Sequence, residues 1–503
     1  MAKKIMIQGT MSNTGKSFIT AGLCRIFRQD GYKTAPFKSQ NMALNSYITQ
    51  EGLEIGRAQA VQAEAAGTEP LSDMNPILLK PNSDTGSQVI LHGVPVGDMS
   101  AREYFARKKS LIPEIMDSFH RLEEQYDVIV IEGAGSPAEI NLKQDDIVNM
   151  GLAELVDSPV LLVGDIDRGG VFAQLYGTVM LLEEAERKRI GGLIVNKFRG
   201  DVSLLKPGTE RIEELLGIPV VGVVPMIKAD IDDEDSLSER LSPRDAPAGN
   251  RADIAVIRFP HLSNFTDFHV LELQPDVAVR YVDNGEDLGN PDLIILPGTK
   301  NTVQDFIWMR QAGLERRIRR MALDGVPVFG ICGGFQMMGQ ELHDPDGTEG
   351  GVPGRILPGM DLIPMSTVFS EKKVRSRDRG CFGEVPGILK NLSGMELEGY
   401  QIHMGVSEFL TDEAAAKGNF IRCEETCPGS EVVGYADGNI YGTYLHGVFD
   451  APGIVSVLVS SLTGRDPEKV QNYAAYREAQ YDRIADVLRK CLDMDRIRGL
   501  MSL

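Results

Sequence analysis

A glycine-rich turn near the start of the chain, Gly9-Thr-Met-Ser-Asn-Thr-Gly-Lys-Ser17, separates a short apolar segment from an amphipathic one. Residues 5–8 have the composition of a buried strand, and residues 16–30 carry apolar side chains at helical spacing. A strand, a glycine-rich loop and a helix in this order are the context of a phosphate-binding loop. The turn therefore constrains the first part of the chain to an α/β fold.

The loop residues predict a nucleotide site. Backbone N–H groups of such a loop, together with the N-terminus of its helix, bind phosphate oxygens. We expect Lys16 to contact the β- and γ-phosphates and Ser17 to bind Mg²⁺. Five residues separate the two glycines, one more than in G-x-x-x-x-G-K-[ST]. The predicted nucleotide-binding residues of the loop are Gly9, Thr14, Gly15, Lys16 and Ser17.

Polar residues at the ends of later strands extend this predicted site. Glu132 is expected to bind Mg²⁺ or to orient water, and Asp165 and Asp167 are weaker candidates of the same kind. Asn196 lies where an amide can recognise adenine, with a turn residue as the alternative. Lys38 is expected to contact the γ-phosphate or a substrate carboxylate, with a solvated lysine as the alternative.

A second sharp turn, Phe329-Gly-Ile-Cys-Gly-Gly334, predicts a nucleophilic cysteine. The strand before Cys332 and the glycines after it match a nucleophile elbow. The N–H groups of Gly333 and Gly298 are candidates for an oxyanion hole. A cysteine nucleophile needs a base, and His446, which follows a late apolar strand, is the best candidate.

A change of composition near residue 230 divides the chain. An acidic run and a Pro/Ala/Gly-rich stretch predict an exposed linker at 236–252. Alternating strands and helices on both sides predict two α/β domains, at 1–235 and 253–450, followed by a helical segment at 451–503. The predicted strands are 5–8, 32–37, 127–131, 160–163, 192–195 and 220–224, then 254–258, 277–282, 293–296, 326–329 and 439–444.

Overall composition limits the partners and the compartment. The formal net charge of −20 argues against nonspecific nucleic-acid binding, which needs a basic surface. No apolar run is long enough to predict a transmembrane helix. The six cysteines are scattered, as in proteins of a reducing compartment. We therefore expect a cytoplasmic protein without nucleic-acid or membrane partners.

The motifs carry a family resemblance. The cysteine turn with its late histidine resembles the triad-type glutamine amidotransferases, and the phosphate loop resembles the dethiobiotin-synthetase-like ATPases. Their fusion in this order is similar to the cobyrinic and cobyric acid synthases of corrinoid biosynthesis. Within that group, blocks that cover 35–45, 54–60, 73–81 and 258–267 resemble the cobyric acid synthases.

The resemblance implies a function for each predicted domain. Residues 1–235 would be a dethiobiotin-synthetase-like synthetase domain that uses ATP and Mg²⁺. Residues 253–450 would be a class I-like, triad-type glutamine amidotransferase domain. ATP would phosphorylate a carboxylate of adenosylcobyrinic acid a,c-diamide, and ammonia released from glutamine at Cys332 would displace the phosphate. Four rounds, on the b, d, e and g side chains, would give adenosylcobyric acid.

Two questions stay open at the level of the sequence. Many triad amidotransferases carry His-x-Glu, but Gly447 and Val448 follow His446, so the third group is unassigned, with Asp450 and Glu408 as candidates. The nearest alternative function is cobyrinic acid a,c-diamide synthase, which the block at 38–45 disfavours.

Two functions outside corrinoid biosynthesis are further alternatives. A partitioning ATPase often has a second lysine early in the loop, where this chain has Thr10, and it has no use for the Cys/His pair. Amidation of a cell-wall precursor by a similar fused enzyme is the remaining alternative.

Overall fold

The structure is a computed structural model that describes residues 2–81, 86–227, 229–231, 251–424, 432–467 and 472–503. Most of the predicted linker at 236–252 lies outside these residues. The chain forms two compact units. Unit 1 comprises Met1–Ala43, Leu53–Asp232 and Ala474–Leu503, and unit 2 comprises Leu44–Gly52 and Asp233–Tyr473.

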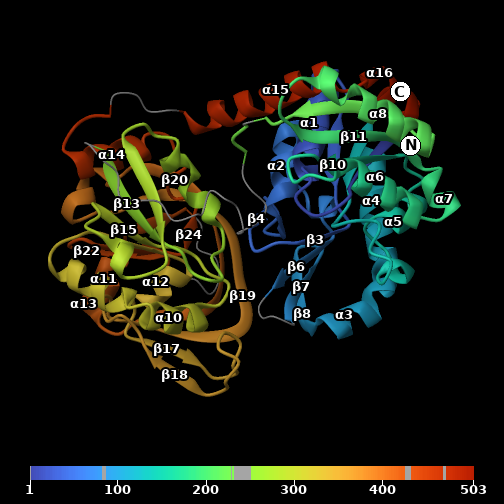
Figure 1. The fold of residues 1–503 in the computed structure, drawn as a ribbon. Coiled ribbons are helices and arrows are strands. Elements are labelled where there is room, and N and C mark those ends of the chain that lie inside the picture. Colours follow the sequence, from blue (N-terminus) through green and yellow to red (C-terminus); the bar gives the residue numbers. More distant parts are fainter. Residues whose placement is uncertain (1, 82–85, 228, 232–250, 425–431, 468–471) are drawn as a thin grey trace. The chain divides into compact units, whose positions relative to one another are not determined.

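Unit 1 is built on a six-stranded parallel sheet with the order β12-β11-β10-β1-β9-β2 (Figure 1). Its strands are β1 (Lys3–Gly9), β2 (Thr34–Phe37), β9 (Val128–Glu132), β10 (Val160–Asp165), β11 (Ile190–Phe198) and β12 (Val220–Pro225). All six occupy the segments predicted as strands. The parallel α/β fold predicted for the first part of the chain is therefore confirmed.

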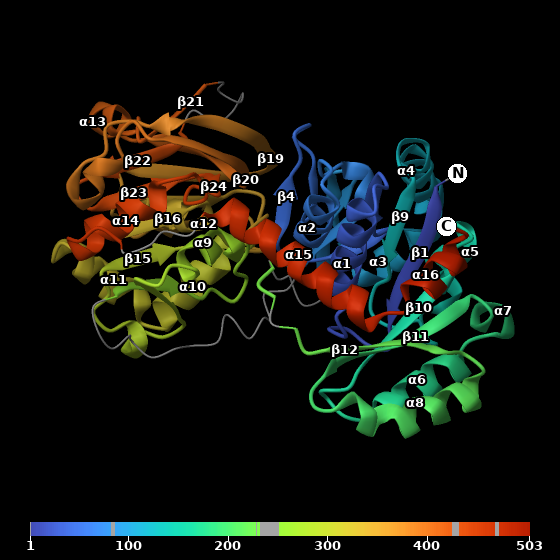
Figure 2. The same ribbon diagram turned by 90° about the horizontal axis from the view of Figure 1, so that it is seen from above.

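Alternate residues of these strands face two different cores, because side chains of a strand point to opposite sides in turn. Met6 faces a core with α4, α5, α6 and α8, whereas Ile5 and Ile7 face a core with α1, α15 and α16 (Figure 2). The helices are α1 (Lys16–Gln29), α4 (Ile112–Gln125), α5 (Met150–Leu155), α6 (Val171–Leu181), α7 (Glu184–Arg187), α8 (Val202–Leu216), α15 (Tyr473–Cys491) and α16 (Met494–Met501).

A smaller sheet between β2 and β9 in the sequence was not predicted. It has the order β3-β6-β7-β8, with β6, β7 and β8 antiparallel. The elements of this region are β3 (Gln40–Met42), β5 (Glu54–Gly56), α2 (Arg57–Ala66), β6 (Ile77–Pro81), β7 (Gly86–Leu91), β8 (Val94–Ser100) and α3 (Ala101–Arg107). β8 is largely exposed, so its sequence lacks the apolar run that marks the central strands.

Unit 2 contains a second six-stranded sheet with the order β14-β13-β15-β16-β23-β22, parallel except for β22. Its strands are β13 (Ala252–Ile257), β14 (Val277–Val282), β15 (Leu293–Leu296), β16 (Val328–Ile331), β22 (Gly434–Asp437) and β23 (Ile440–Thr443). They form one hydrophobic core with the helices of the unit. These helices are α9 (His269–Glu272), α10 (Thr302–Gln311), α11 (Leu314–Leu323), α12 (Gly333–Met337), α13 (Asp412–Lys417) and α14 (Ile454–Thr463).

Residues 302–323, for which the sequence predicts one helix ending in basic residues, form two helices, α10 and α11. They are separated at Gly313, whose φ of 71° lies in the left-handed region. Only glycine adopts that conformation without a Cβ penalty, so the helix ends there and a new one begins.

A further sheet in unit 2 was missed by the sequence analysis. Its order is β18-β17-β19-β20-β24, and β21 pairs with β19. Its strands are β17 (Glu341–Asp344), β18 (Arg355–Pro358), β19 (Met365–Phe382), β20 (Glu396–Phe409), β21 (Ile421–Cys423) and β24 (Leu445–His446). β19 carries charged residues on much of its length, and this hides the apolar signal of a strand.

The structure divides the predicted C-terminal segment, 451–503, between the two units. α14 buries Ile454 and Leu458 in the core of unit 2, whereas α15 and α16 bury Ile484, Leu488 and Ile497 in a core of unit 1. The division follows from packing, because each helix must bury its apolar side against a different sheet. Within the described part of the chain, no helix is long and apolar enough to cross a membrane.

We predict that Leu488→Ala destabilises unit 1. Leu488 is fully buried beside α1, and removing a buried leucine side chain costs about 2–5 kcal/mol. Trp308, the only tryptophan, belongs to unit 2. During urea unfolding, circular dichroism should therefore show a transition at lower denaturant while the tryptophan fluorescence transition stays in place.

Leu204→Ala is the matched control, because Leu204 of unit 1 is 82% exposed. Equal urea midpoints in the circular dichroism transitions of Leu488→Ala and Leu204→Ala would show that the C-terminal helices do not stabilise unit 1.

Candidate active sites

The phosphate loop connects β1 to α1 in a conformation that depends on its two glycines. Gly15 precedes α1 with φ 95°, and no side chain caps the helix. A Cβ on Gly9 would collide with Thr14 Oγ1, and a Cβ on Gly15 would collide with Asn196 Nδ2. The turn is thus closely packed, and its N–H groups and the N-terminus of α1 form the kind of site that binds phosphate oxygens.

The ammonium group of Lys16 lies within this loop. Its Nζ donates hydrogen bonds to Met11 O and Gly135 O, both at 3.2 Å. Lys16 is buried although it carries a charge. A buried ammonium beside the N-terminus of a helix is suited to bind a polyphosphate.

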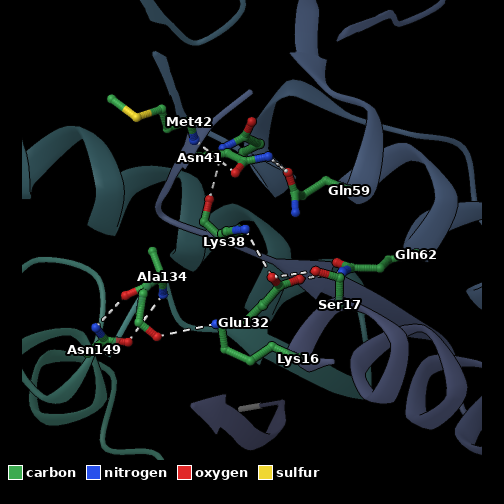
Figure 3. Close-up of polar contacts among 12 residues, drawn as sticks. Lys16, Ser17, Lys38, Asn41, Met42, Gln59, Gln62, Glu132, Ala134 and Asn149 are labelled. Atoms are coloured by element: carbon green, nitrogen blue, oxygen red, sulfur yellow. Dashed lines mark hydrogen bonds and ion pairs between the residues drawn. The ribbon is translucent and has the colours of Figure 1, made fainter. Parts of the chain in front are cut away.

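Glu132 is the centre of a buried polar cluster at the end of β9. Ser17 Oγ donates to its Oε1 at 2.8 Å, and Lys38 Nζ donates to the same oxygen at 2.9 Å. Gln62 Nε2 donates to Oε2 at 2.5 Å. Glu132 is 1% exposed, and the close-up shows these side chains around its carboxylate (Figure 3). The structure therefore brings together Ser17, Lys38 and Glu132.

The residues of this cluster fit a magnesium ion. Ser17 and Glu132 offer a hydroxyl and a carboxylate oxygen, and Mg²⁺ takes one or two carboxylates together with phosphate oxygens and water. In the described ranges, no group of three or more His, Cys, Asp or Glu side chains could hold a metal by itself. Asp165 and Asp167, the weaker candidates, form ion pairs with Lys197 and Arg199 at 2.8 Å.

Asn196 lies against the phosphate loop. Its Nδ2 donates to Thr14 O at 2.7 Å, and the residue is 4% exposed. The neighbouring Lys197 donates to Asn13 O at 2.6 Å. This contact supports a role for Asn196 in holding the loop, which the sequence did not distinguish from recognition of adenine.

Cys332 lies in a strained turn between β16 and α12. Its φ of 52° and ψ of −112° are unusual for any residue with a Cβ. Its N–H donates to Thr443 O at 2.8 Å, and Gly334 lies so close to Leu296 O that a Cβ there would collide. The turn therefore has the geometry of a nucleophile elbow, which presents the thiol at the end of the strand.

Asp267 is the acid that contacts His446. His446 Nδ1 lies 2.7 Å from Asp267 Oδ2, and Gly447 N donates to Asp267 Oδ1 at 3.0 Å. The Cys332 side chain is also close enough to the imidazole to contribute to the raised pKa of His446. The acid found in contact with His446 is Asp267, whereas the sequence suggested Asp450 and Glu408, for which a role at this site stays a prediction. Asp267 lies 179 residues before His446, so no local motif could identify it, although it ends the block at 258–267.

The surroundings of His446 favour its protonated form. Burial opposes the charge, but Asp267 and the Cys332 side chain outweigh it and raise the pKa of His446 to about 10. His446 is completely buried, so the charge interacts in a medium of low dielectric. An imidazolium at neutral pH suits a site in which a thiolate is the nucleophile.

The two predicted oxyanion donors lie on either side of this pair. Gly333 begins α12, so its N–H lacks an intrahelical acceptor, and no other acceptor for it occurs among the described residues. Gly298 follows β15, and a Cβ placed on it would be 2.9 Å from His446 Cε1. The geometry is compatible with both donors, and their role stays a prediction.

Sequence reasoning missed the other neighbours of the thiol site. The Tyr400 ring stacks on His446, with centroids 5.2 Å apart and an interplanar angle of 21°. Asn264 Nδ2 lies 3.3 Å from His446 Nε2, and Ile402 O is 3.5 Å from Cys332 Sγ. Tyr400 and Ile402 belong to β20, in the sheet that was not predicted, and no sequence signal marked them.

Two family models cover most of the chain. Residues 5–238 match a "CobQ/CobB/MinD/ParA nucleotide binding domain". Residues 253–453 match a "CobB/CobQ-like glutamine amidotransferase domain". The first match contains the phosphate loop, and the second contains Cys332, His446 and Asp267. The predicted order of a phosphate-loop domain and an amidotransferase domain is therefore confirmed.

Relatives named "Cobyric acid synthase" match over the whole length. The protein from Ruminiclostridium cellulolyticum is 56% identical over 99% of this chain and 96% of its own. That from Lachnoclostridium phytofermentans is 54% identical over 100% of this chain and 99% of its own. That from Photorhabdus laumondii subsp. laumondii is 48% identical, over 100% and 98%. The chain belongs to the cobyric acid synthase family.

Proposed function

We propose that this chain catalyses the ATP- and glutamine-dependent amidation of adenosylcobyrinic acid a,c-diamide on its b, d, e and g carboxylates, giving adenosylcobyric acid in cobalamin biosynthesis. The observation that carries the proposal is the presence of both a phosphate loop and a buried Cys332–His446–Asp267 arrangement in a chain with full-length cobyric acid synthase relatives. ATP and glutamine are cytoplasmic metabolites, and the reaction takes place there without nucleic acid or membrane.

The first half of the reaction activates a carboxylate. A carboxylate is a poor electrophile, and transfer of the γ-phosphoryl group to its oxygen creates a leaving group. Lys16 and the N-terminus of α1 bind the phosphates, while Lys38, beside Glu132, contacts the γ-phosphate or the substrate carboxylate. A Mg²⁺ ion held by Ser17 and Glu132 would neutralise charge on the phosphates.

The second half releases ammonia from glutamine. The Cys332 thiolate attacks the carboxamide carbon, and the N–H groups of Gly333 and Gly298 stabilise the oxyanion. His446 donates its proton to the departing ammonia, which leaves a thioester on Cys332. Water, deprotonated by His446, then hydrolyses the thioester to glutamate. Asp267 accepts from Nδ1 and keeps Nε2 directed at the thiol.

The two half-reactions are joined when ammonia attacks the acyl phosphate and displaces inorganic phosphate, which gives an amide.

The alternative function, cobyrinic acid a,c-diamide synthase, uses the same chemistry on other carboxylates. Mass spectrometry of products formed from the a,c-diamide, ATP and glutamine tests the choice. Four successive amidations of the a,c-diamide support cobyric acid synthase, and an unchanged a,c-diamide would contradict it.

We predict that Cys332→Ser removes amidation with glutamine as donor but leaves amidation with ammonium salts intact. Loss of a catalytic nucleophile lowers turnover by roughly 10⁴-fold or more, whereas free ammonia bypasses the thiol site. Product formation with each donor is the measurement. If a high ammonia concentration fails to restore the amide, Cys332 does more than release ammonia.

Lys16→Ala is expected to lower amidation by roughly 10²-fold or more with either donor, because phosphoryl activation precedes attack by nitrogen. Glutamine hydrolysis at Cys332 should survive at least in part. Lys206→Ala is the control, because the side chain of Lys206 is 72% exposed in the same unit. Wild-type rates of ammonia-dependent amidation in Lys16→Ala would refute the phosphate-loop assignment.

Asp267→Asn is expected to move the alkaline limb of the glutaminase pH profile to lower pH. The charged Asp267 holds the pKa of His446 near 10, and without that charge the imidazolium loses its proton earlier. The titratable groups that act on His446 are Asp267, Cys332 and His403. The measurement is kcat/KM for glutamine hydrolysis between pH 6 and about 10.

The same pKa shift makes the free energy of unfolding depend on pH. A histidine whose pKa is raised on folding stabilises the native state fully below its ordinary value of 6.5, and this contribution is lost as the pH rises toward 10. The stability difference between wild type and Asp267→Asn should shrink over that window. An unchanged alkaline limb, with an unchanged difference, would contradict the role given to Asp267.

A further inference from the structure

A short segment, Leu44–Gly52, belongs to unit 2 although the chain before and after it belongs to unit 1. Its strand β4 (Ser46–Ile48) packs against β19 and β20. Ile48 is fully buried in a small cluster with Tyr400 and Ile402. These two residues are neighbours of His446 and Cys332, so the segment is part of the surroundings of the thiol site.

The segment contacts two residues that touch His446 directly. Ser46 N donates to Asn264 Oδ1 at 3.1 Å, and Tyr400 Oη donates to Ser46 O at 3.4 Å. Arg377 Nη1 donates to Tyr47 Oη at 2.8 Å and helps to hold the segment. Ser46 and Asn264 are both almost completely buried, so water does not compete strongly for these bonds.

The bond from Ser46 decides which end of the Asn264 amide faces His446. An asparagine side chain has one oxygen that accepts and one nitrogen that donates. Because the Ser46 N–H is a donor, it requires the oxygen, and the Nδ2 group is left 3.3 Å from His446 Nε2. The backbone of Asn264, with φ 52°, lies in the left-handed region and adds to the constraint.

This orientation opposes the proton transfer that the proposed function requires. His446 Nε2 must carry a proton while the Cys332 thiolate attacks glutamine, and it must then give that proton to ammonia. Nδ2 of Asn264 can donate to Nε2 only while that nitrogen is unprotonated. Once Nε2 carries a proton, two donors face each other, which is unfavourable in a buried site. Asp267 therefore favours the imidazolium while Asn264 restrains it.

We propose that the segment Leu44–Gly52 restrains glutamine hydrolysis, with Asn264 as the positioning residue through which it acts on His446. Displacement of Ser46 frees the Asn264 amide to rotate and present Oδ1 to the protonated Nε2. The restraint is then removed, and the thiol site becomes active. This inference rests on the proposed function, because it assumes that Cys332 and His446 hydrolyse glutamine.

The test is glutamine hydrolysis by the full-length protein without ATP or corrinoid. Ser46→Pro removes the N–H, Ser46→Ala keeps it, and Asn264→Ala removes the amide. Ser46→Pro and Asn264→Ala should each raise kcat about three- to tenfold, the effect of one hydrogen bond, with the KM for glutamine unchanged. Ser46→Ala should match wild type. The double variant should gain no more than either single one, because both act on one contact.

A rise in kcat is diagnostic, because damage to the fold lowers activity. If Ser46→Pro does not fold, Asn264→Ala alone decides. An unchanged or lower kcat in Asn264→Ala overturns the inference, as does a rise in Ser46→Ala equal to that in Ser46→Pro. Cys332→Ser separates this outcome from failure of the proposed function. Hydrolysis that survives Cys332→Ser refutes the glutaminase assignment, whereas Cys332-dependent hydrolysis that does not respond to these variants refutes only the restraint.

Discussion

Close packing at the carboxyl ends of parallel strands is the constraint on which both candidate sites depend. At the end of β1, Gly9 and Gly15 leave no room for a Cβ, and at the end of β16 Gly334 lies against Leu296 O. A turn this tight exposes backbone N–H groups and the first residue of the following helix. The same geometry therefore serves phosphate binding in unit 1 and thiol presentation in unit 2.

The positive charges at the two sites come from a few local residues and are opposite in sign to the net charge of the chain. The net charge is −20, yet Lys16 and Lys38 are buried at the phosphate loop, and burial strengthens their interaction with anions. At the thiol site, burial acts against the charge on His446, and Asp267 together with the Cys332 side chain reverses that effect. Each site thus depends on one or two specific partners, and overall composition does not reveal them.

The parts that could be predicted from the sequence are those with a local signal. An apolar strand followed by a glycine-rich turn marked Lys16 and Cys332, and the central strands of both parallel sheets were found in the same way. Asp267, Asn264 and Tyr400 reach His446 from distant parts of the chain, through contacts that no spacing encodes. β19 was missed because a strand with many charged residues lacks the period that marks a half-buried strand.

The units also show why a linear division of the chain is insufficient. Unit 2 includes 44–52 from the first part of the sequence, and unit 1 includes 474–503 from its end. A cut within 236–252 would leave the C-terminal fragment without Ser46, the partner that orients Asn264. It would leave the N-terminal fragment without Ile484, Leu488 and Ile497, which help to fill one of its cores. Each catalytic half of this chain is therefore completed by a segment that its own stretch of sequence does not contain.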